Sequence, residues 1–247
     1  MTATMPLRIA MWSGPRNIST AMMRAFENRA DTAVVDEPFY AAWLLRSGAE
    51  HPMREVILVA QPTDPDQVIS GLLGPIPGGR RIFYQKHMAH HMTPDMDLEW
   101  MSACANVFLI RRPVEVLASY AVRRPDASLE DIGVVQQCDL FEREADRLGA
   151  PPPVIESADV LADPRRALTA LCAAVGLDFD PAMLAWPAGP RQSDGVWAPA
   201  WYDAVERSTG FAPIRPPASL EDLAPGLRPI AEAAAPYYES LARFKLG

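Results

Sequence analysis

Lysine is scarce in this chain of 247 residues: only Lys86 and Lys245 occur, and arginine supplies the other cations. The formal net charge is −8 and the pI is close to 5.0. A chain this acidic does not form the broad basic face on which nucleic acid binds, so we expect no nucleic-acid partner. An anionic ligand must instead be held by a small local group of cations.

Other absences exclude further classes of protein. The three cysteines, Cys104, Cys138 and Cys172, are far apart and form no C-x-x-C pair, which predicts reduced, buried thiols. The first residues lack a signal-peptide pattern, and no apolar run approaches the ~18 residues of a membrane span. No H-E-x-x-H spacing occurs, so we expect no metal site. These features favour a cytoplasmic protein without a membrane partner.

The apolar pattern predicts an α/β fold. Hydrophobic residues make up 49% of the chain, and the length fits a single domain over residues 1–247. Continuous apolar runs are typical of buried parallel strands, and helical stretches separate them. We therefore expect three layers, with a parallel sheet of about five strands flanked by helices, and residues 179–247 as a Pro- and Trp-rich covering segment with a C-terminal helix. The predicted strands are Leu7–Trp12, Thr32–Val35, Arg81–Tyr84, Val107–Ile110 and Pro153–Glu156.

The first strand leads into the most informative segment, LRIAMWSGPRNISTAMMR. After the turn SGP come Arg16, Asn17, Ser19 and Thr20, and a helical stretch follows. A strand, loop and helix start of this kind aims backbone N–H groups at one point and forms an anion site. It is not a Walker A loop, because Ile18 and Ser19 stand where that motif needs Gly and Lys. Taken alone, the hydroxyls also fit an ordinary helix cap.

A second segment, VFLIRRPVEVLASY, places another cation at a strand end. Arg111 leaves the strand, Pro113 opens a helix, and Ser119 follows Arg111 by eight residues. A guanidinium and a hydroxyl returned to the same edge can hold one phosphate, with the arginine donating two parallel bonds. In parallel sheets ligands bind at the carboxyl ends of the strands, so both segments point to one site.

These motifs resemble the sulfotransferases that use 3′-phosphoadenosine 5′-phosphosulfate (PAPS). In that family a P-[RK]-[ST]-G-[ST]-[ST] loop binds the 5′-phosphosulfate, and residues 15–20 match it, with Asn17 for Ser/Thr and Ile18 for Gly. The family's 3′-phosphate element, an Arg at a strand end with a Ser eight residues on, matches Arg111 and Ser119. The segment VIESADVLADPRRALTALCAAVGLDF resembles a third family element. The opening segment also resembles bacterial sulfotransferase-like proteins and a plant branched-chain aminotransferase-like group.

The resemblance, which covers roughly residues 7–180, implies a fold, a reaction and a set of binding residues. The fold would be P-loop NTPase-like. The reaction would move a sulfuryl group from PAPS to a hydroxyl or amine of a small-molecule acceptor and leave PAP (3′-phosphoadenosine 5′-phosphate). The residues implied to hold the donor are Pro15, Arg16, Asn17, Ser19, Thr20, Arg111 and Ser119.

Catalysis would need a cation for the leaving group and a base for the acceptor. Arg16 is the candidate for the leaving-group charge. Glu37 ends the second strand in D-E-P and is the favoured base, with His87 and His90 in QKHMAHH as the alternatives. A neutral histidine needs little adjustment near pH 7, whereas a glutamate needs partial burial. We interpret Lys86 either as a phosphate or leaving-group contact or as a surface cation.

Two other functions remain open at this point. An Mg²⁺-dependent nucleotide phosphoryl transferase or hydrolase would use the same fold, although no apolar run ends in a clear Walker B aspartate. A non-catalytic nucleotide-binding domain for sensing or partner binding is favoured by Ile18, where the resembling family has glycine. We interpret Trp197, Trp201 and Tyr202 mainly as packing residues. The pattern specifies neither the acceptor nor the oligomeric state.

Overall fold

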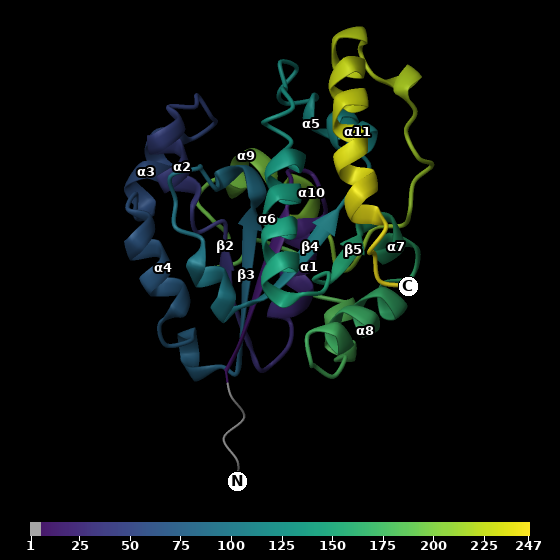
Figure 1. Cartoon of the computed structure of the whole chain (residues 1–247). Helices are drawn as coiled ribbons and strands as arrows, with labels where there is room; N and C mark the ends of the chain where they lie inside the picture. Colours follow the sequence, from purple (N-terminus) through teal and green to yellow (C-terminus); the bar gives the residue numbers. More distant parts are fainter. Residues whose placement is uncertain (1–5) are drawn as a thin grey trace.

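A five-stranded parallel sheet forms the centre of the computed structural model, which describes residues 6–247 (Figure 1). The strand order is β2-β3-β1-β4-β5, and every neighbouring pair is parallel. β1, which leads into the opening loop, therefore lies at the middle of the sheet. The predicted fold class is confirmed, with all five expected strands present. The strands are β1 (Leu7–Ser13), β2 (Thr32–Asp36), β3 (Ile82–Met88), β4 (Ala105–Ile110) and β5 (Val154–Glu156).

Helices cover both faces of this sheet because its strands alternate their side chains between the two. Ile9 and Met11 of β1 pack with α1 and α8, whereas Ala10 and Trp12 pack with α4 and α6. α11 packs against α5 and α6 (Figure 1). The α-helices in residues 6–247 are α1 (Ser19–Glu27), α2 (Tyr40–Ser47), α3 (Arg54–Ala60), α4 (Pro65–Leu73), α5 (Pro113–Tyr120), α6 (Val134–Leu148), α7 (Ser157–Ala162), α8 (Pro164–Ala174), α9 (Ala198–Trp201), α10 (Asp203–Glu206) and α11 (Arg228–Ala242).

Several elements differ from the sequence prediction in ways that have local causes. β3 continues to Met88, four residues beyond the predicted end, because it pairs with β1 along its whole length. The sequence pattern predicts a helix over Leu129–Leu148, but α6 starts only at Val134, since Gly133 takes a left-handed conformation with φ of 66°. α3 was not predicted, and its Val59 is almost fully exposed, so the segment lacks a regular apolar stripe.

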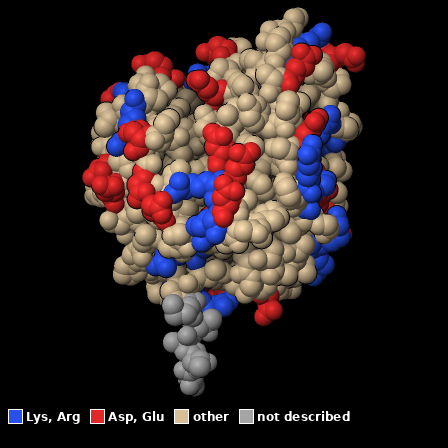
Figure 2. Space-filling view, viewed as in Figure 1, with Lys and Arg blue, Asp and Glu red and all other residues tan. Residues whose placement is uncertain are grey.

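The C-terminal end of the chain returns to the sheet. The Leu246 N–H donates to the Val154 carbonyl, which extends the edge at β5. On the face shown in Figure 2, acidic and basic side chains lie side by side. Two ion pairs involve side chains of α6: Arg143 pairs with Glu99, and Arg147 pairs with Glu144. Across residues 6–247, no helix is both long enough and apolar enough to cross a bilayer.

Candidate active site

A cavity of about 290 Å³ opens at the carboxyl ends of β1, β2 and β3. This is the edge where a parallel sheet is expected to bind ligands. The opening loop and the Arg111 segment meet at this cavity. The Nε of Arg16 donates a hydrogen bond to the Ser119 hydroxyl (3.0 Å), although the two residues are 103 positions apart in the sequence. The predicted site residues that line it are Pro15, Arg16, Asn17, Ser19, Thr20, Glu37, His90, Arg111 and Ser119.

The opening loop is held in a strained conformation. Arg16 and Ile18 have φ of 56° and 49°, a left-handed backbone that costs energy for a side chain with a Cβ. Two long-range bonds hold the loop there. The Arg111 guanidinium donates to the Arg16 carbonyl (2.6 Å), and the Asn17 amide donates to the Leu109 carbonyl (2.6 Å). Strain of this kind persists only where surrounding contacts fix it, and such sites are commonly functional.

Gly14 serves a different purpose from the family glycine that Ile18 replaces. A Cβ at Gly14 would lie 2.3 Å from the Ile132 carbonyl oxygen. The loop backbone therefore passes directly against the segment before α6, and only glycine leaves room for it. The left-handed turn itself falls at Ile18.

The start of α1 leaves its N–H groups unused and lacks acidic side chains. Ile18 occupies the N-cap position without a capping hydrogen bond, and the first turn contains no acid. The free N–H groups and the helix dipole make this end positive. Burial, together with the charges of Arg123 and Arg111, lowers the pKa of Arg16. Cations gathered this closely favour a bound anion.

Glu37 follows β2 and meets a buried network at the cavity wall. Lys86 Nζ donates to Glu37 Oε1 (2.6 Å), to Asp36 Oδ1 (2.8 Å) and to the Tyr202 hydroxyl (2.8 Å). Burial raises the pKa of Glu37 to about 6, against the lowering effect of Lys86 and with a further raising effect of Asp36. Lys86 is thus neither a surface cation nor, in this arrangement, free to contact a phosphate.

The two histidine candidates lie in different places. Alternation along β3 puts Lys86 and His87 on opposite faces, and His87 stacks on Trp12 with ring centroids 4.5 Å apart. The cavity lining does not include His87, whose pKa burial lowers to about 3. His90 does line the cavity, and burial also lowers its pKa to about 3. Of the three candidate bases, the structure places Glu37 and His90 at the cavity.

Aromatic rings form much of the remaining wall. Tyr40 stacks on His91 at 4.6 Å, and His51 stacks on Trp201 at 5.5 Å. Burial lowers the pKa of His51 to about 4, so its ring is neutral near pH 7. The sequence prediction missed His51, because it stands in a connecting loop without a motif. Trp201 and Tyr202 line the cavity as well as packing within the covering segment.

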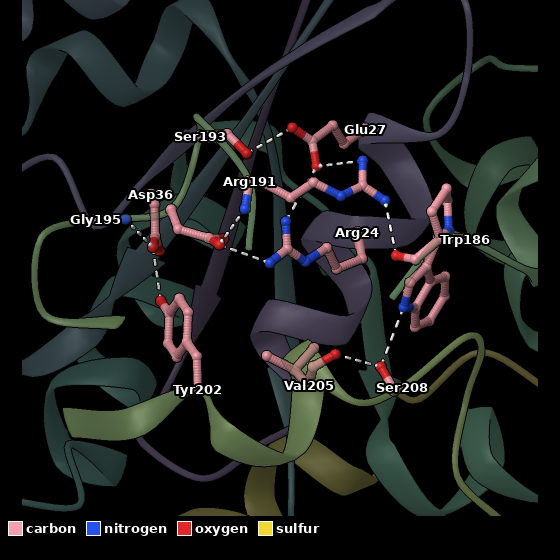
Figure 3. A network of polar contacts seen from close by, with 12 residues as sticks. Arg24, Glu27, Asp36, Trp186, Arg191, Ser193, Gly195, Tyr202, Val205 and Ser208 are labelled. Carbon is pink, nitrogen blue, oxygen red and sulfur yellow. Dashed lines mark hydrogen bonds and ion pairs between the residues drawn. The ribbon is translucent and has the colours of Figure 1, made fainter. Parts of the chain in front are cut away.

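The covering segment is attached to α1 and β2 by polar contacts (Figure 3). Arg24 of α1 donates to Asp194 (2.7 Å), and Ser193 donates to Glu27 (2.5 Å). The Gly195 N–H and the Tyr202 hydroxyl both donate to Asp36 Oδ2, as Figure 3 shows. These contacts place the aromatic part of the covering segment opposite the end of β2.

Asp194→Ala should lower the free energy of unfolding by about 2 kcal/mol. Arg24 is only 1% exposed, so loss of its partner leaves a buried cation. Glu27, 3.5 Å from Arg24, keeps the cost below that of a fully unpaired charge. Urea unfolding would measure the change, with Glu99→Ala as the control, since its exposed ion pair with Arg143 is worth under about 1 kcal/mol. Equal losses of unfolding free energy in the two variants would contradict a stabilising role for the buried Arg24–Asp194 ion pair.

A family model described as a sulfotransferase domain matches residues 7–243. The chain belongs to the sulfotransferase domain family. Two relatives of this sulfotransferase domain are the Arabidopsis thaliana branched-chain-amino-acid aminotransferase-like proteins 1 and 2, at 35% identity over 207 residues and 33% over 204 residues. The matches cover 84% and 83% of this chain but 37% and 36% of the relatives. The chain thus spans little more than a third of their length.

Solved sulfotransferase domains share the fold. The domain from the curacin biosynthetic pathway aligns with a TM-score of 0.54 at 16% identity, covering 97% of this chain and 92% of that one. The domain from the Synechococcus PCC 7002 olefin synthase aligns with a TM-score of 0.52 at 17% identity, covering 94% and 96%. The resemblance inferred from the motifs is confirmed at the level of family and fold.

Proposed function

We propose that this domain transfers a sulfuryl group from PAPS to a hydroxyl or amine of a small-molecule acceptor. Membership of the sulfotransferase family supports the reaction class. The observation that carries the donor assignment is the meeting of two predicted phosphate elements in one cavity, where Arg16 contacts Ser119 and Arg111 contacts the Arg16 carbonyl.

The opening loop fits the 5′-phosphosulfate end of the donor. The unused N–H groups at the start of α1, the hydroxyls of Ser19 and Thr20 and the Arg16 guanidinium all border the cavity. Bound PAPS would supply an activated sulfuryl group. Arg16 is placed to stabilise the negative charge that develops on the phosphate oxygen as that group leaves.

Arg111 and Ser119 fit the 3′-phosphate. Glu115 accepts from the Arg111 Nε (3.1 Å), and the Arg16 carbonyl accepts from its Nη1 (2.6 Å). The guanidinium is therefore ordered before a ligand arrives, which reduces the entropy lost on binding. A second phosphate site of this kind distinguishes PAPS and PAP from nucleotides phosphorylated only at the 5′ position.

The position and the pKa of Glu37 support a role for it as the general base. With its pKa near 6, Glu37 is mostly ionised at pH 7 yet retains proton affinity. His90, whose pKa is about 3, is a much weaker base at the same cavity. The aromatic wall beside Glu37, with Tyr40, His51 and Trp201, supports an acceptor that presents apolar surface around its reacting group.

Calorimetry with PAP tests the donor assignment, and a sulfate-transfer assay over a panel of hydroxyl and amine acceptors tests the reaction. We expect PAP to bind without added Mg²⁺ and to outcompete ATP. ATP binding that requires Mg²⁺ and displaces PAP would favour phosphoryl transfer instead. Tight PAP binding without transfer to any acceptor would favour a non-catalytic nucleotide-binding domain.

A further inference from the structure

Lys86 is buried with all its hydrogen-bonding capacity in use. Its side chain is 1% exposed, and an ammonium group has three N–H donors. Three oxygens receive them, from Asp36, Glu37 and Tyr202, all within 2.8 Å. A phosphate or sulfate could reach this ammonium only by displacing one of those partners.

The partners of Lys86 are themselves fixed. Asp36 Oδ2 accepts from the Tyr202 hydroxyl (2.6 Å) and from the Gly195 N–H (3.1 Å). The Tyr202 hydroxyl also accepts from the Trp197 indole (3.1 Å). Glu37, the third partner, is fixed through its main chain, because its N–H donates to the Lys86 carbonyl (2.9 Å). Its backbone is left-handed, with φ of 39°.

We propose that Lys86, anchored by Asp36 and Tyr202, is the positioning residue of Glu37: it orients the Glu37 carboxylate at the cavity wall and sets its affinity for a proton. The inference rests on the proposed role of Glu37 as the base. It assigns the more deeply buried of the chain's two lysines to the acceptor side of the reaction and removes it from the donor site.

The charges around Glu37 make this assignment testable. Lys86 stabilises the ionised carboxylate, whereas Asp36 destabilises it, so the two neighbours act in opposite directions. Tyr40 of α2 and Tyr120 of α5 also lie near Glu37, and both are neutral near pH 7, since burial raises phenol pKa values that ordinarily lie near 10. The histidines at the cavity, His51, His90 and His91, are neutral because burial lowers theirs. Besides Lys86, the positively charged side chains that line the cavity are Arg16 and Arg111.

Two single substitutions should move the titration of Glu37 in opposite directions. Lys86→Met leaves two buried carboxylates together and should raise the midpoint by about one pH unit or more, whereas Asp36→Asn should lower it. The titration is followed by carbon-13 NMR of glutamate side chains, with Glu37→Gln identifying the signal. The acidic limb of kcat/KM against pH should shift in the same two directions. Lys245→Met is the matched control, because Lys245 is 41% exposed and pairs with Glu156 and Asp159.

Shifts in the same direction, or no shift in either variant, would overturn the proposal. So would a Lys86→Met protein that loses PAP affinity more than tenfold while Glu37 titrates unchanged, since Lys86 would then serve the donor. If Lys86→Met does not fold, Lys86→Gln takes its place: it also removes the ammonium charge, so the Glu37 midpoint should rise, and an unchanged midpoint would overturn the proposal. If no acceptor is sulfated but Glu37 titrates as expected, the proposed function fails and the positioning role stands.

Discussion

Arg111→Ala should reduce the affinity for PAP by about two orders of magnitude. The substitution removes the charge-assisted hydrogen bonds that we propose Arg111 makes to the 3′-phosphate, which are worth about 1.5–3 kcal/mol. It also frees the Arg16 carbonyl, whose bond to Arg111 (2.6 Å) holds the strained opening loop. The 5′ and 3′ ends of the site should therefore weaken together. Isothermal titration calorimetry with PAP measures the loss.

Arg112→Ala provides the control for this experiment. Arg112 is the next residue, is 42% exposed, and reaches Glu115 only at 3.9 Å. It does not line the cavity. Its loss should change PAP affinity by less than about twofold, as expected for a screened surface charge. Unchanged PAP binding in Arg111→Ala, or an equal loss in the two variants, would contradict the assigned 3′-phosphate site.

Glu37→Gln should lower kcat by about 10²- to 10⁴-fold, the usual contribution of a general base. The glutamine keeps the size of the side chain and an oxygen for Lys86, but it cannot take a proton from the acceptor. Affinity for PAP should stay within about threefold, because the proposed donor residues lie in the β1–α1 loop, in α1, after β4 and in α5. Steady-state kinetics and calorimetry on the same protein separate the two effects.

The competing base is tested with His90→Gln. His90 borders the cavity, but burial lowers its pKa to about 3, so we expect kcat to fall by less than about tenfold. A severe loss in His90→Gln combined with a mild one in Glu37→Gln would transfer the role to the histidine. His87 needs no such test at the cavity, because its ring packs against Trp12 on the other face of the sheet.

The half of the cavity formed by the opening loop and the Arg111 segment could be located from the sequence because its signals are local. The turn before Arg16, the hydroxyls after it, and the eight-residue spacing from Arg111 to Ser119 are all readable along the chain. Apolar runs located the strands, and the rule for parallel sheets joined their carboxyl ends at one edge. The Arg16–Ser119 contact across 103 positions is what that reasoning implies.

The half of the cavity around Glu37 could not be predicted because it depends on contacts between distant segments. The sequence prediction ended β3 at Tyr84, which treated Lys86 and His87 as neighbours in one loop. Pairing with β1 carries the strand to Met88 and sends those two side chains to opposite faces. Tyr202 reaches Asp36 over 166 positions, and no periodic pattern encodes such a contact.

The left-handed backbone at Ile18 was the least predictable feature. Its cause lies in bonds from Arg111 and Asn17 to distant carbonyls, and not in the residue itself. A sequence can show that glycine is missing from a motif. It cannot show that tertiary contacts will hold an isoleucine there in a left-handed conformation.

The polar attachment of the covering segment has a consequence for how this domain could diversify. The proposed donor residues lie in the β1–α1 loop, in α1, after β4 and in α5, whereas Trp201, Val205 and Phe211 enter the cavity from a separate stretch of chain. That stretch is joined to α1 through Asp194, which accepts from Arg24, and to the end of β2 through Asp36, which accepts from the Gly195 N–H. Under the proposed function, substitutions at Trp201, Val205 or Phe211 would reshape the acceptor pocket and leave the residues of the proposed phosphate sites in place. On that proposal, acceptor range and donor binding are carried by separate stretches of chain and can evolve, or be engineered, independently.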